Sequence, residues 1–301
     1  MKAIVRKAAA ALCAAAVFWA VQPAAAAAAV PTVSARCAAL MDAATGEILY
    51  EKNGAQRALI ASTTKIMTGL LVSECGELDR LVTVPDAAVG LEGSSMYLQK
   101  DERLQVQELL YGMMLHSGND AALALAIVLA GSEQAFVRQM NQRAAALGLR
   151  QTHFANPHGL DSGQNYSTAL DLAALARAAM DHTVFRAVVG TKTITCAGRT
   201  LTNHNKLLWR YTGCTGIKTG YTRSAGRILV SAAERGGREL IAVTIADPDD
   251  WRDHTALLDY GFAVLAQRTP VYPQIRRVSW KNGCRKFWRE APACPGGRRR
   301  N

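Results

Sequence analysis

The sequence predicts a mixed α/β (α+β) fold in which both ends of the folded body contribute strands to one sheet and a helical lobe is inserted between them. Residues 38–50 form one hairpin pattern, with two apolar runs around a turn that contains Gly46. Residues 227–245 form a second, with its turn at 234–237. Between the hairpins, apolar residues recur at helical spacing. A cleft between lobe and sheet is the natural place for a functional site.

The first and last helices are each expected to follow one of the two hairpins. One starts near Ser62, presents the apolar residues 66, 67, 70 and 71 on one face and ends at Gly76. The other is expected over residues 252–266, after the second hairpin.

The helical lobe is expected to occupy residues 104–180. This stretch is predicted to be helical throughout, except at 156–159, where the sequence Asn-Pro-His-Gly breaks the pattern. Residues 121–130 are almost wholly apolar, so the helix there should be buried on all sides.

The first residues have the pattern of a secretory signal peptide. Three basic residues precede an apolar stretch over 8–21, and the alanines after Pro23 supply small-residue cleavage sites. An uncleaved membrane anchor is the alternative, because the apolar stretch is nearly long enough to cross a bilayer. We therefore expect an exported protein that acts outside the cytoplasm. Its expected parts are a signal peptide at 1–29, a body at 30–265 and a basic tail at 266–301.

The formal net charge of +11 lies outside the body. The signal segment carries three positive charges, and residues 276–301 carry nine basic residues and one acid, so these two segments account for the whole +11. A nucleic-acid partner is therefore not expected. The tail, which contains Trp280, Phe287 and Trp288, is expected either to contact an anionic membrane or wall polymer weakly or to remain a solvated segment.

Seven cysteines are present, six of them after the signal segment. In an exported chain they could form disulfides, and Cys196–Cys214 and Cys284–Cys294 are the pairs favoured by their separation; free thiols are the alternative. Their spacing does not suggest a zinc site, and no metal is expected. The four histidines His153, His158, His204 and His254 show no metal-ligand spacing and are expected at turns or on the surface.

Three short motifs carry the chemistry: Ser62-Thr63-Thr64-Lys65, Ser117-Gly118-Asn119 and Lys218-Thr219-Gly220. A serine hydroxyl needs an adjacent base to become a nucleophile. On a helix, residues three apart have Cβ atoms about 5–6 Å apart, so Lys65 can reach Ser62. A lysine acts as a base only when burial or a nearby cation lowers its pKa, and Lys218 could be that cation.

The other two motifs are expected to face the same serine. Ser117 and Asn119 lie where a helical pattern pauses, and their side chains could relay a proton and hold a substrate amide. Lys218 precedes the second hairpin and is expected on an edge strand, where Gly220 would let a substrate backbone approach closely. An S-x-x-K or an S-x-N motif arises by chance on the order of once in a chain this long, and Lys218-Thr219-Gly220 alone could be a solvated turn. The three together, each once and in this order, point to acyl transfer by a serine with a lysine base.

The three motifs resemble the signature of the penicillin-recognising serine enzymes. The surrounding sequence is specifically similar to the low-molecular-mass D-alanyl-D-alanine carboxypeptidases, over about residues 34–265. The resemblance implies an antiparallel sheet flanked by helices, with an all-helical lobe, and it makes residues 30–265 the catalytic domain. The stretches that carry it are 61–68, 109–115, 117–122, 156–161 and 216–222.

The resemblance also implies a role for each motif residue. Ser62 would be the acylated nucleophile and Lys65 its base, while Ser117 and Asn119 would line the cleft. Lys218 and Thr219 would bind the side of the substrate that carries the terminal carboxylate. The backbone N–H groups of Ser62 and Tyr221 would form the oxyanion hole. Arg252 would be a further carboxylate contact. The residues concerned are Ser62, Lys65, Ser117, Asn119, Lys218, Thr219, Gly220, Tyr221 and Arg252.

The implied reaction is removal of the terminal D-alanine from peptidoglycan stem pentapeptides. The partners would be muropeptides, with β-lactams as covalent inhibitors, and no cofactor would be needed. The sequence shows no counterpart of the glutamate-bearing loop with which class A β-lactamases deacylate. The alternatives are a non-catalytic wall-binding protein of the same fold, a β-lactamase or an endopeptidase.

Overall fold

A computed structural model describes residues 29–268 of the protein. The predicted signal peptide, apart from Ala29, lies outside the described residues. So do residues 269–301 of the basic tail, with the proposed Cys284–Cys294 pair. Signal cleavage, the domain boundaries and the role of the tail therefore remain predictions.

One five-stranded antiparallel sheet organises the molecule, with the strand order β2-β1-β11-β10-β9. The first strand pairs with the last, so that Cys37 stands opposite Ile245, and the sheet is closed by the two ends of the body as the sequence predicts. Both expected hairpins form, and β9 is an edge strand. The strands are β1 Cys37–Asp42, β2 Ile48–Lys52, β9 Cys214–Thr222, β10 Gly226–Arg235 and β11 Arg238–Ile245.

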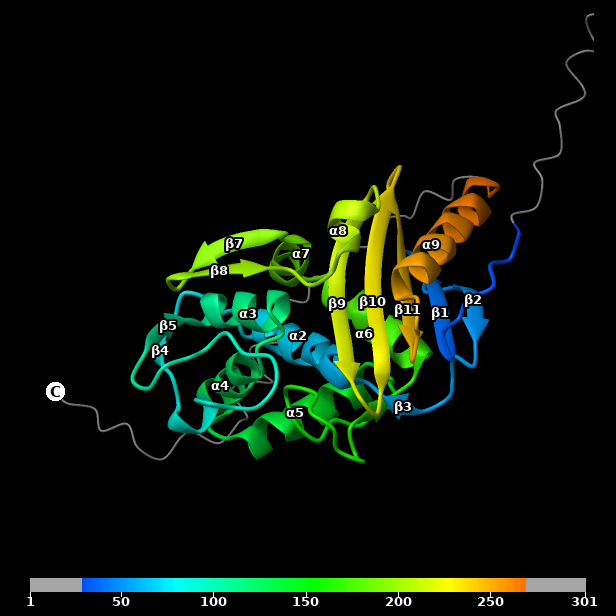
Figure 1. The fold of residues 1–301 in the computed structure, drawn as a ribbon. Helices are drawn as coiled ribbons and strands as arrows, with labels where there is room; N and C mark the ends of the chain where they lie inside the picture. The colour runs from blue at the N-terminus through cyan, green and yellow to red at the C-terminus, as the bar shows by residue number, and fades with distance from the viewer. Residues whose placement is uncertain (1–28, 269–301) are drawn as a thin grey trace, which may run out of the picture.

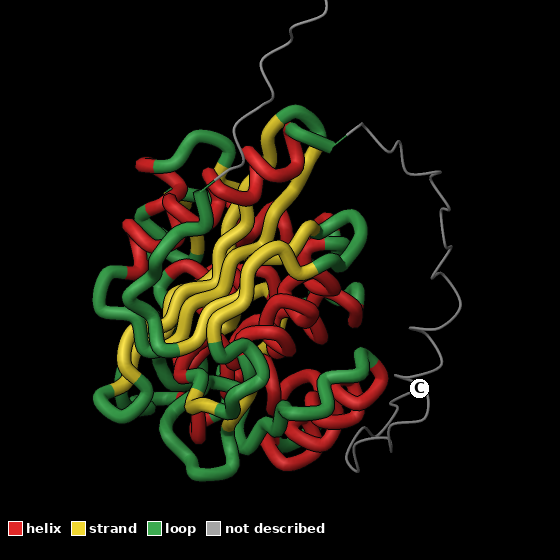
Figure 2. The backbone as a smooth tube through the Cα atoms, turned by 90° about the vertical axis from the view of Figure 1, so that its right-hand side faces the viewer, coloured by secondary structure: helices red, strands yellow, loops and turns green. Residues whose placement is uncertain are grey.

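The central strands are buried on both faces because helices cover both sides of the sheet. Along β10, Ile228 and Val230 belong to the core on the lobe side, whereas Leu229 between them packs with Leu257 and Leu258 of α9 (Asp250–Ala266). This two-residue alternation divides the apolar side chains between two cores. Figure 1 shows α9 on one side of the sheet and the helical lobe on the other, and Figure 2 shows the strands running through the middle of the molecule between helices. The predicted α+β class, an antiparallel sheet flanked by helices with a helical lobe, is confirmed.

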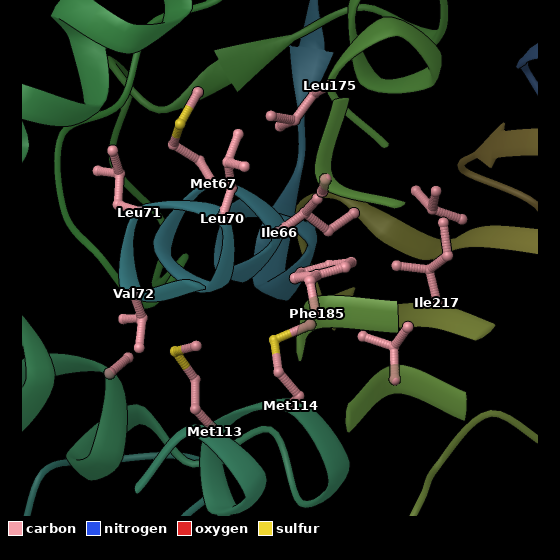
Figure 3. Close-up of a cluster of buried hydrophobic side chains, with 14 of the residues drawn as sticks. Ile66, Met67, Leu70, Leu71, Val72, Met113, Met114, Leu175, Phe185 and Ile217 are labelled. Atoms are coloured by element: carbon pink, nitrogen blue, oxygen red, sulfur yellow. The ribbon is translucent and has the colours of Figure 1, made fainter. Parts of the chain in front are cut away.

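The helical lobe is built around α2 (Lys65–Cys75), whose side chains are buried over most of its length. Figure 3 shows Met67 and Leu70 on one side of this helix and Met113 and Met114 on the other, all within one buried cluster. The side chains packed around α2 fix the position of its first residue, Lys65. The other helices are α3 Val106–Leu115, α4 Asn119–Ala130, α5 Glu133–Ala146, α6 Ala169–Met180, α7 Thr183–Gly190 and α8 Leu207–Arg210, with short 3-10 helices η1 Ala61–Thr64 and η2 Asp86–Ala88.

The remaining strands form three small two-stranded sheets. They are β3 Ala58–Leu59 with β6 Tyr166–Ser167, β4 Leu81–Thr83 with β5 Arg103–Gln105, and β7 Thr193–Cys196 with β8 Arg199–Thr202. No single helix within residues 29–268 is both long and apolar enough to cross a membrane; α4 and α5 pass that test only as a pair, bent by 88°.

One sequence-based expectation is wrong, and of the two alternatives for the cysteines, the free thiols are found in the described residues. The helical prediction over 104–180 fails at 147–168, a long loop with the short strand β6, because its polar groups bond to neighbouring elements: Asn165 donates from Nδ2 to Thr64 Oγ1. The disulfide Cys196–Cys214 is absent. Cys214 instead donates its thiol hydrogen to the carbonyl of Gly216 at the start of β9. All four cysteines in the described part of the chain are free thiols.

Candidate active site

Ser62 lies in the 3-10 helix η1, immediately before α2. The loop 156–159 packs directly beneath it: a Cβ on Gly159, which has φ +88°, would stand only 2.0 Å from the carbonyl oxygen of Ala61. The Asn-Pro-His-Gly sequence that breaks the helical pattern therefore forms the floor of the site. Its glycine is required both by the left-handed backbone and by this contact.

Lys65 is completely buried, and its nitrogen faces three oxygen atoms. The Nζ lies 2.7 Å from Asn119 Oδ1 and 2.5 Å from the carbonyl oxygen of His158, both of which only accept hydrogen bonds. The third position faces Ser62 Oγ at 3.0 Å. In a neutral lysine, two N–H groups satisfy the two carbonyl oxygens, which leaves the lone pair directed at the Ser62 hydroxyl.

The electrostatics of the site favour the neutral form of Lys65. Burial lowers the pKa of Lys65 well below its usual value of 10.5, and the charge of Lys218 lowers it further, while Asp120 acts in the opposite direction. Burial also lowers the pKa of Lys218 to about 7. The expectation that burial and a second lysine would tune Lys65 agrees with these surroundings.

Ser117 occupies the bend between α3 and α4, with a left-handed backbone at φ +61°. The next turn fixes the orientation of the neighbouring amide: Asn119 donates from Nδ2 to the carbonyl of Glu92 at 2.8 Å, so that its Oδ1 faces Lys65. Strain at such a position is typical of functional sites, where surrounding structure holds the residue in place.

Asp120 is the buried residue that holds the loop over the second motif. Its carboxylate accepts hydrogen bonds from the backbone N–H groups of Met96 and Leu98 and from the Ser95 hydroxyl. This carboxylate therefore brings residues 94–98 against the start of α4. No sequence pattern assigns a role to Asp120, and only its place directly after the second motif could have marked it.

The third motif lies on the edge strand β9, as predicted. Lys218 is buried and donates from Nζ to the carbonyl of Thr219 at 2.9 Å. A Cβ on Gly220 would stand 3.3 Å from the backbone nitrogens of Ser62 and Thr63, so the strand lies directly against the nucleophile turn. The close approach expected of this glycine is thus made by the protein's own backbone.

A cavity of about 620 Å³ opens where these elements meet. Eight of the nine sequence-predicted residues converge on it. Lys65, Asn119 and Lys218 are buried beside it, with Lys65 and Asn119 joined to Ser62 through the Lys65 nitrogen. The five that line the cavity are Ser62, Ser117, Thr219, Gly220 and Tyr221.

Arg252 does not meet its expectation. It lies in the first turn of α9 away from the cavity lining, and its guanidinium pairs with Asp249 at 3.1 Å and Asp253 at 3.3 Å. The arginine that lines the cavity is Arg227 of β10, which stands opposite Tyr221 in the ladder. Sheet register places it there, because this first residue of the predicted second hairpin pairs with Tyr221 of β9.

The cavity also has cationic and aromatic residues that sequence reasoning missed. His204 and Lys206 line it on the side of Ser117, and Trp251 and Asp250 line it beside Arg227. No sequence spacing singles these residues out, because they reach the cavity only through the packing of separate elements.

The expectation that the histidines lie at turns or on the surface is wrong for His254, which is buried within α9. His204 stacks on His116 with 5.5 Å between ring centroids, and burial, together with Lys218 and His116, lowers the pKa of His204 to about 4. His158 is buried in the loop beneath Ser62. His254 is buried between Ser231 and Thr244, which its ring nitrogens contact at 2.6 and 3.0 Å. Among the described residues, no group of three or more His, Cys, Asp or Glu side chains could hold a metal ion.

Comparison with known proteins agrees with this geometry. The family model described as D-alanyl-D-alanine carboxypeptidase matches residues 24–249. The chain is 35% identical over 269 residues to the D-alanyl-D-alanine carboxypeptidase DacF of Bacillus subtilis, covering 84% of this chain and 69% of that protein. It is 38% identical to DacD of Escherichia coli, covering 86% and 69%. The crystal structure of the Streptomyces K15 DD-transpeptidase superimposes with a TM-score of 0.75 at 37% identity, covering 78% of this chain and 99% of that one.

Proposed function

The chain belongs to the D-alanyl-D-alanine carboxypeptidase family, the S11 serine peptidases, and from this premise we propose that it removes the terminal D-alanine of peptidoglycan stem pentapeptides through an acyl-enzyme on Ser62. The observation that carries the proposal is the arrangement around Lys65, whose nitrogen faces two carbonyl oxygens and the Ser62 hydroxyl. A buried amine held in this way is the base that a serine nucleophile needs.

In the proposed acylation, Lys65 takes the proton of the Ser62 hydroxyl while Oγ bonds to the carbonyl carbon between the two D-alanines. The negative charge on the carbonyl oxygen is held by the backbone N–H groups of Ser62 and Tyr221. The C–N bond then breaks as the proton passes to the leaving amine, with the Ser117 hydroxyl as relay. Water attacks the ester, Ser62 recovers its proton, and the shortened stem peptide leaves.

The positions of two lysines support one orientation of the bound peptide in the cavity. Lys206 lines the cavity and Lys218 is buried beside Thr219, and neither lysine has a carboxylate within 4.0 Å among the described residues. This uncompensated positive charge suits the terminal carboxylate of the substrate, with Thr219 as a further donor. Asn119 and the backbone of β9 are then available for the amides on the acyl side.

A labelling experiment tests the nucleophile. Purified protein should bind fluorescent penicillin covalently at one site, and mass spectrometry should locate the adduct on Ser62. The S62A variant should lose labelling completely, whereas S73A should keep it, because Ser73 lies on α2 with its hydroxyl bonded to Gly69. Retained labelling in S62A would reject the assignment.

Product analysis separates the alternative functions. Incubation with a stem pentapeptide should release one D-alanine per peptide. Binding without release would instead identify a non-catalytic wall-binding protein. Cleavage of cross-linked dimers would identify an endopeptidase, and rapid turnover of penicillin a β-lactamase. The similar K15 protein is a DD-transpeptidase, so one reaction should include an acceptor amine. A product that contains the acceptor would identify transpeptidation.

The reaction requires an extracytoplasmic location, since peptidoglycan is assembled outside the membrane. We propose that residues 1–29 direct export and that residues 266–301 make weak contact with the membrane or wall polymer. N-terminal mass analysis of the exported protein tests the first proposal. Deletion of residues 269–301 followed by cell fractionation tests the second.

A further inference from the structure

The cavity extends beyond the proposed oxyanion hole to a group of three residues that none of the motifs contains. Arg227 of β10 is the direct antiparallel partner of Tyr221, and directly opposed residues point to the same face of a sheet. Asp250 and Trp251, the first two residues of α9, line the cavity beside it. Arginine and tryptophan side chains therefore form one wall of the cleft at the end of β9.

Asp250 holds the Arg227 guanidinium in one orientation. Its carboxylate accepts from Nε at 3.1 Å and from Nη2 at 2.7 Å, and the acid itself is only 3% exposed. The arginine side chain is 45% exposed, and its central carbon lies 5.8 Å from the centre of the Trp251 ring. A guanidinium has five N–H donors, so three remain on Arg227 with no acceptor among the described residues.

The orientation of the bound peptide determines which of its groups would lie near the three remaining N–H donors of Arg227. The terminal carboxylate is proposed to lie at the Lys218 and Lys206 side, where the positive charge is uncompensated. The acyl part of the stem peptide must then extend past Tyr221 toward Arg227. A fixed, half-exposed guanidinium is suited to planar recognition of a carboxylate.

We propose that Arg227, positioned by Asp250, is a substrate-specificity residue that binds a free carboxylate in the acyl part of the stem peptide. This inference rests on the proposed function and names the substrate class of the same site. Two groups of a stem peptide carry such a carboxylate: the α-carboxylate of a γ-linked D-glutamate and the side chain of a diaminopimelate third residue. The pair would favour stems that keep the relevant acid over stems in which it is amidated or missing.

The test measures kcat/KM for release of D-alanine from three pentapeptides. The first carries both carboxylates, the second has lysine in place of diaminopimelate, and the third has isoglutamine in place of glutamate. For wild-type protein, one replacement should lower kcat/KM by about tenfold or more, which identifies the carboxylate that is bound. In the R227Q variant, kcat/KM for the first peptide should fall by the same factor. The variant should therefore no longer discriminate among the three peptides.

Two further variants make the result interpretable. R227Q leaves a buried carboxylate unpaired, so R227Q/D250N removes both charges and should show the same loss of discrimination. The matched control is R235Q, on the same strand, where the arginine pairs with Asp259 at 3.2 Å and is 38% exposed. This control should keep the wild-type preference.

Two outcomes would overturn the inference while leaving the proposed function intact. One is a wild-type protein that releases D-alanine from all three peptides equally well. The other is an R227Q variant that retains the wild-type preference. Failure of wild-type protein to release D-alanine or to be labelled by penicillin would instead reject the proposed function, so the two failures are distinguishable.

Discussion

Lys65 combines two requirements that are normally in conflict. A buried ammonium is costly, yet its hydrogen bonds to Asn119 and His158 hold the nitrogen within 3.0 Å of the nucleophile. The conflict is resolved when the side chain is neutral, because two N–H donors then suffice. The same desolvation that disfavours the charge therefore creates the base.

This argument predicts the effect of replacing Lys65 by arginine, which keeps the positive charge but stays protonated. We expect K65R to acylate with penicillin about 10²–10⁴-fold more slowly than wild type, because the base is lost. Stopped-flow or gel-based labelling rates measure the effect. K192R is the control, since Lys192 lies away from the cavity beside Trp209. A K65R protein that acylates at the wild-type rate would contradict a lysine base.

The buried Lys218 should make the free energy of unfolding of the protein depend on pH. Its pKa falls from 10.5 in the unfolded chain to about 7 in the folded protein, because it is buried. Between these values the unfolded chain binds more protons, so this lysine makes the free energy of unfolding rise with pH.

The free energy of unfolding of wild type minus that of K218M should therefore rise by about 2 kcal/mol between pH 7 and pH 9. Urea denaturation at several pH values measures this difference, and subtraction removes the groups that both proteins share. A difference that stays constant or falls over this range would show that Lys218 titrates normally in the folded state.

The residues of the site differ in how far sequence could identify them. Ser62, Lys65 and Lys218 are predictable because each belongs to a short sequence motif. Arg227 and His204 are not, because each reaches the cavity through a tertiary contact. Arg252 was wrongly expected there, because the two residues before it, Asp250 and Trp251, are the ones of α9 that line the cavity.

At the scale of elements, the loop 156–159 controls the position of the nucleophile turn. The turn precedes α2, and Ala61 has a left-handed backbone at φ +44°. The loop lies against that residue on one side, and β9 lies against Ser62 on the other. The nucleophile turn therefore lies between two backbones, which leave no room for a side chain on Gly159 and little room for one on Gly220.

The prediction at this scale compares two glycines of one loop. G159A should destabilise the protein by more than about 2 kcal/mol and slow penicillin acylation, because its Cβ would clash with Ala61. G163A should change neither, since a Cβ at Gly163 meets no atom within 4 Å. Thermal denaturation and labelling rates measure both effects. Equal behaviour of the two variants would contradict this role of the loop.

Element prediction from sequence succeeded where apolar periodicity was strong and failed where polar contacts decide. The buried helices around α2 and the two hairpins repeat apolar residues at their structural period. The loop 147–168 has no such period, and it is held instead by side-chain bonds such as Asn141 Oδ1 accepting from the backbone N–H of Phe154 at 2.9 Å. Such bonds depend on partners distant in sequence, which a local pattern does not contain.

At the scale of the whole molecule, the two ends of the body are joined twice. The first join is the pairing of β1 with β11 in the sheet. The second is a buried polar cluster at the start of α9, where the carboxylate of Asp253 accepts hydrogen bonds from the backbone N–H groups of Ser34 and Ala35 and from the Ser34 hydroxyl. Sequence predicted the shared sheet from its two hairpins, but the polar cluster brings together residues more than 200 positions apart.

This second join should matter for stability and not for chemistry. Burial raises the pKa of Asp253, but hydrogen bonds from Ser34 and Ala35 lower it more, so the acid is charged in the folded protein. D253A would leave buried backbone N–H groups unpaired, and we expect it to lower the free energy of unfolding by about 2–4 kcal/mol.

The control D249A removes an exposed ion pair with Arg252 and should lower the free energy of unfolding by less than about 1 kcal/mol. Urea denaturation measures both variants, and penicillin labelling of the folded fraction should proceed at the wild-type rate in each. A slower rate in D253A alone would mean that the N-terminal segment positions the site as well as closing the fold.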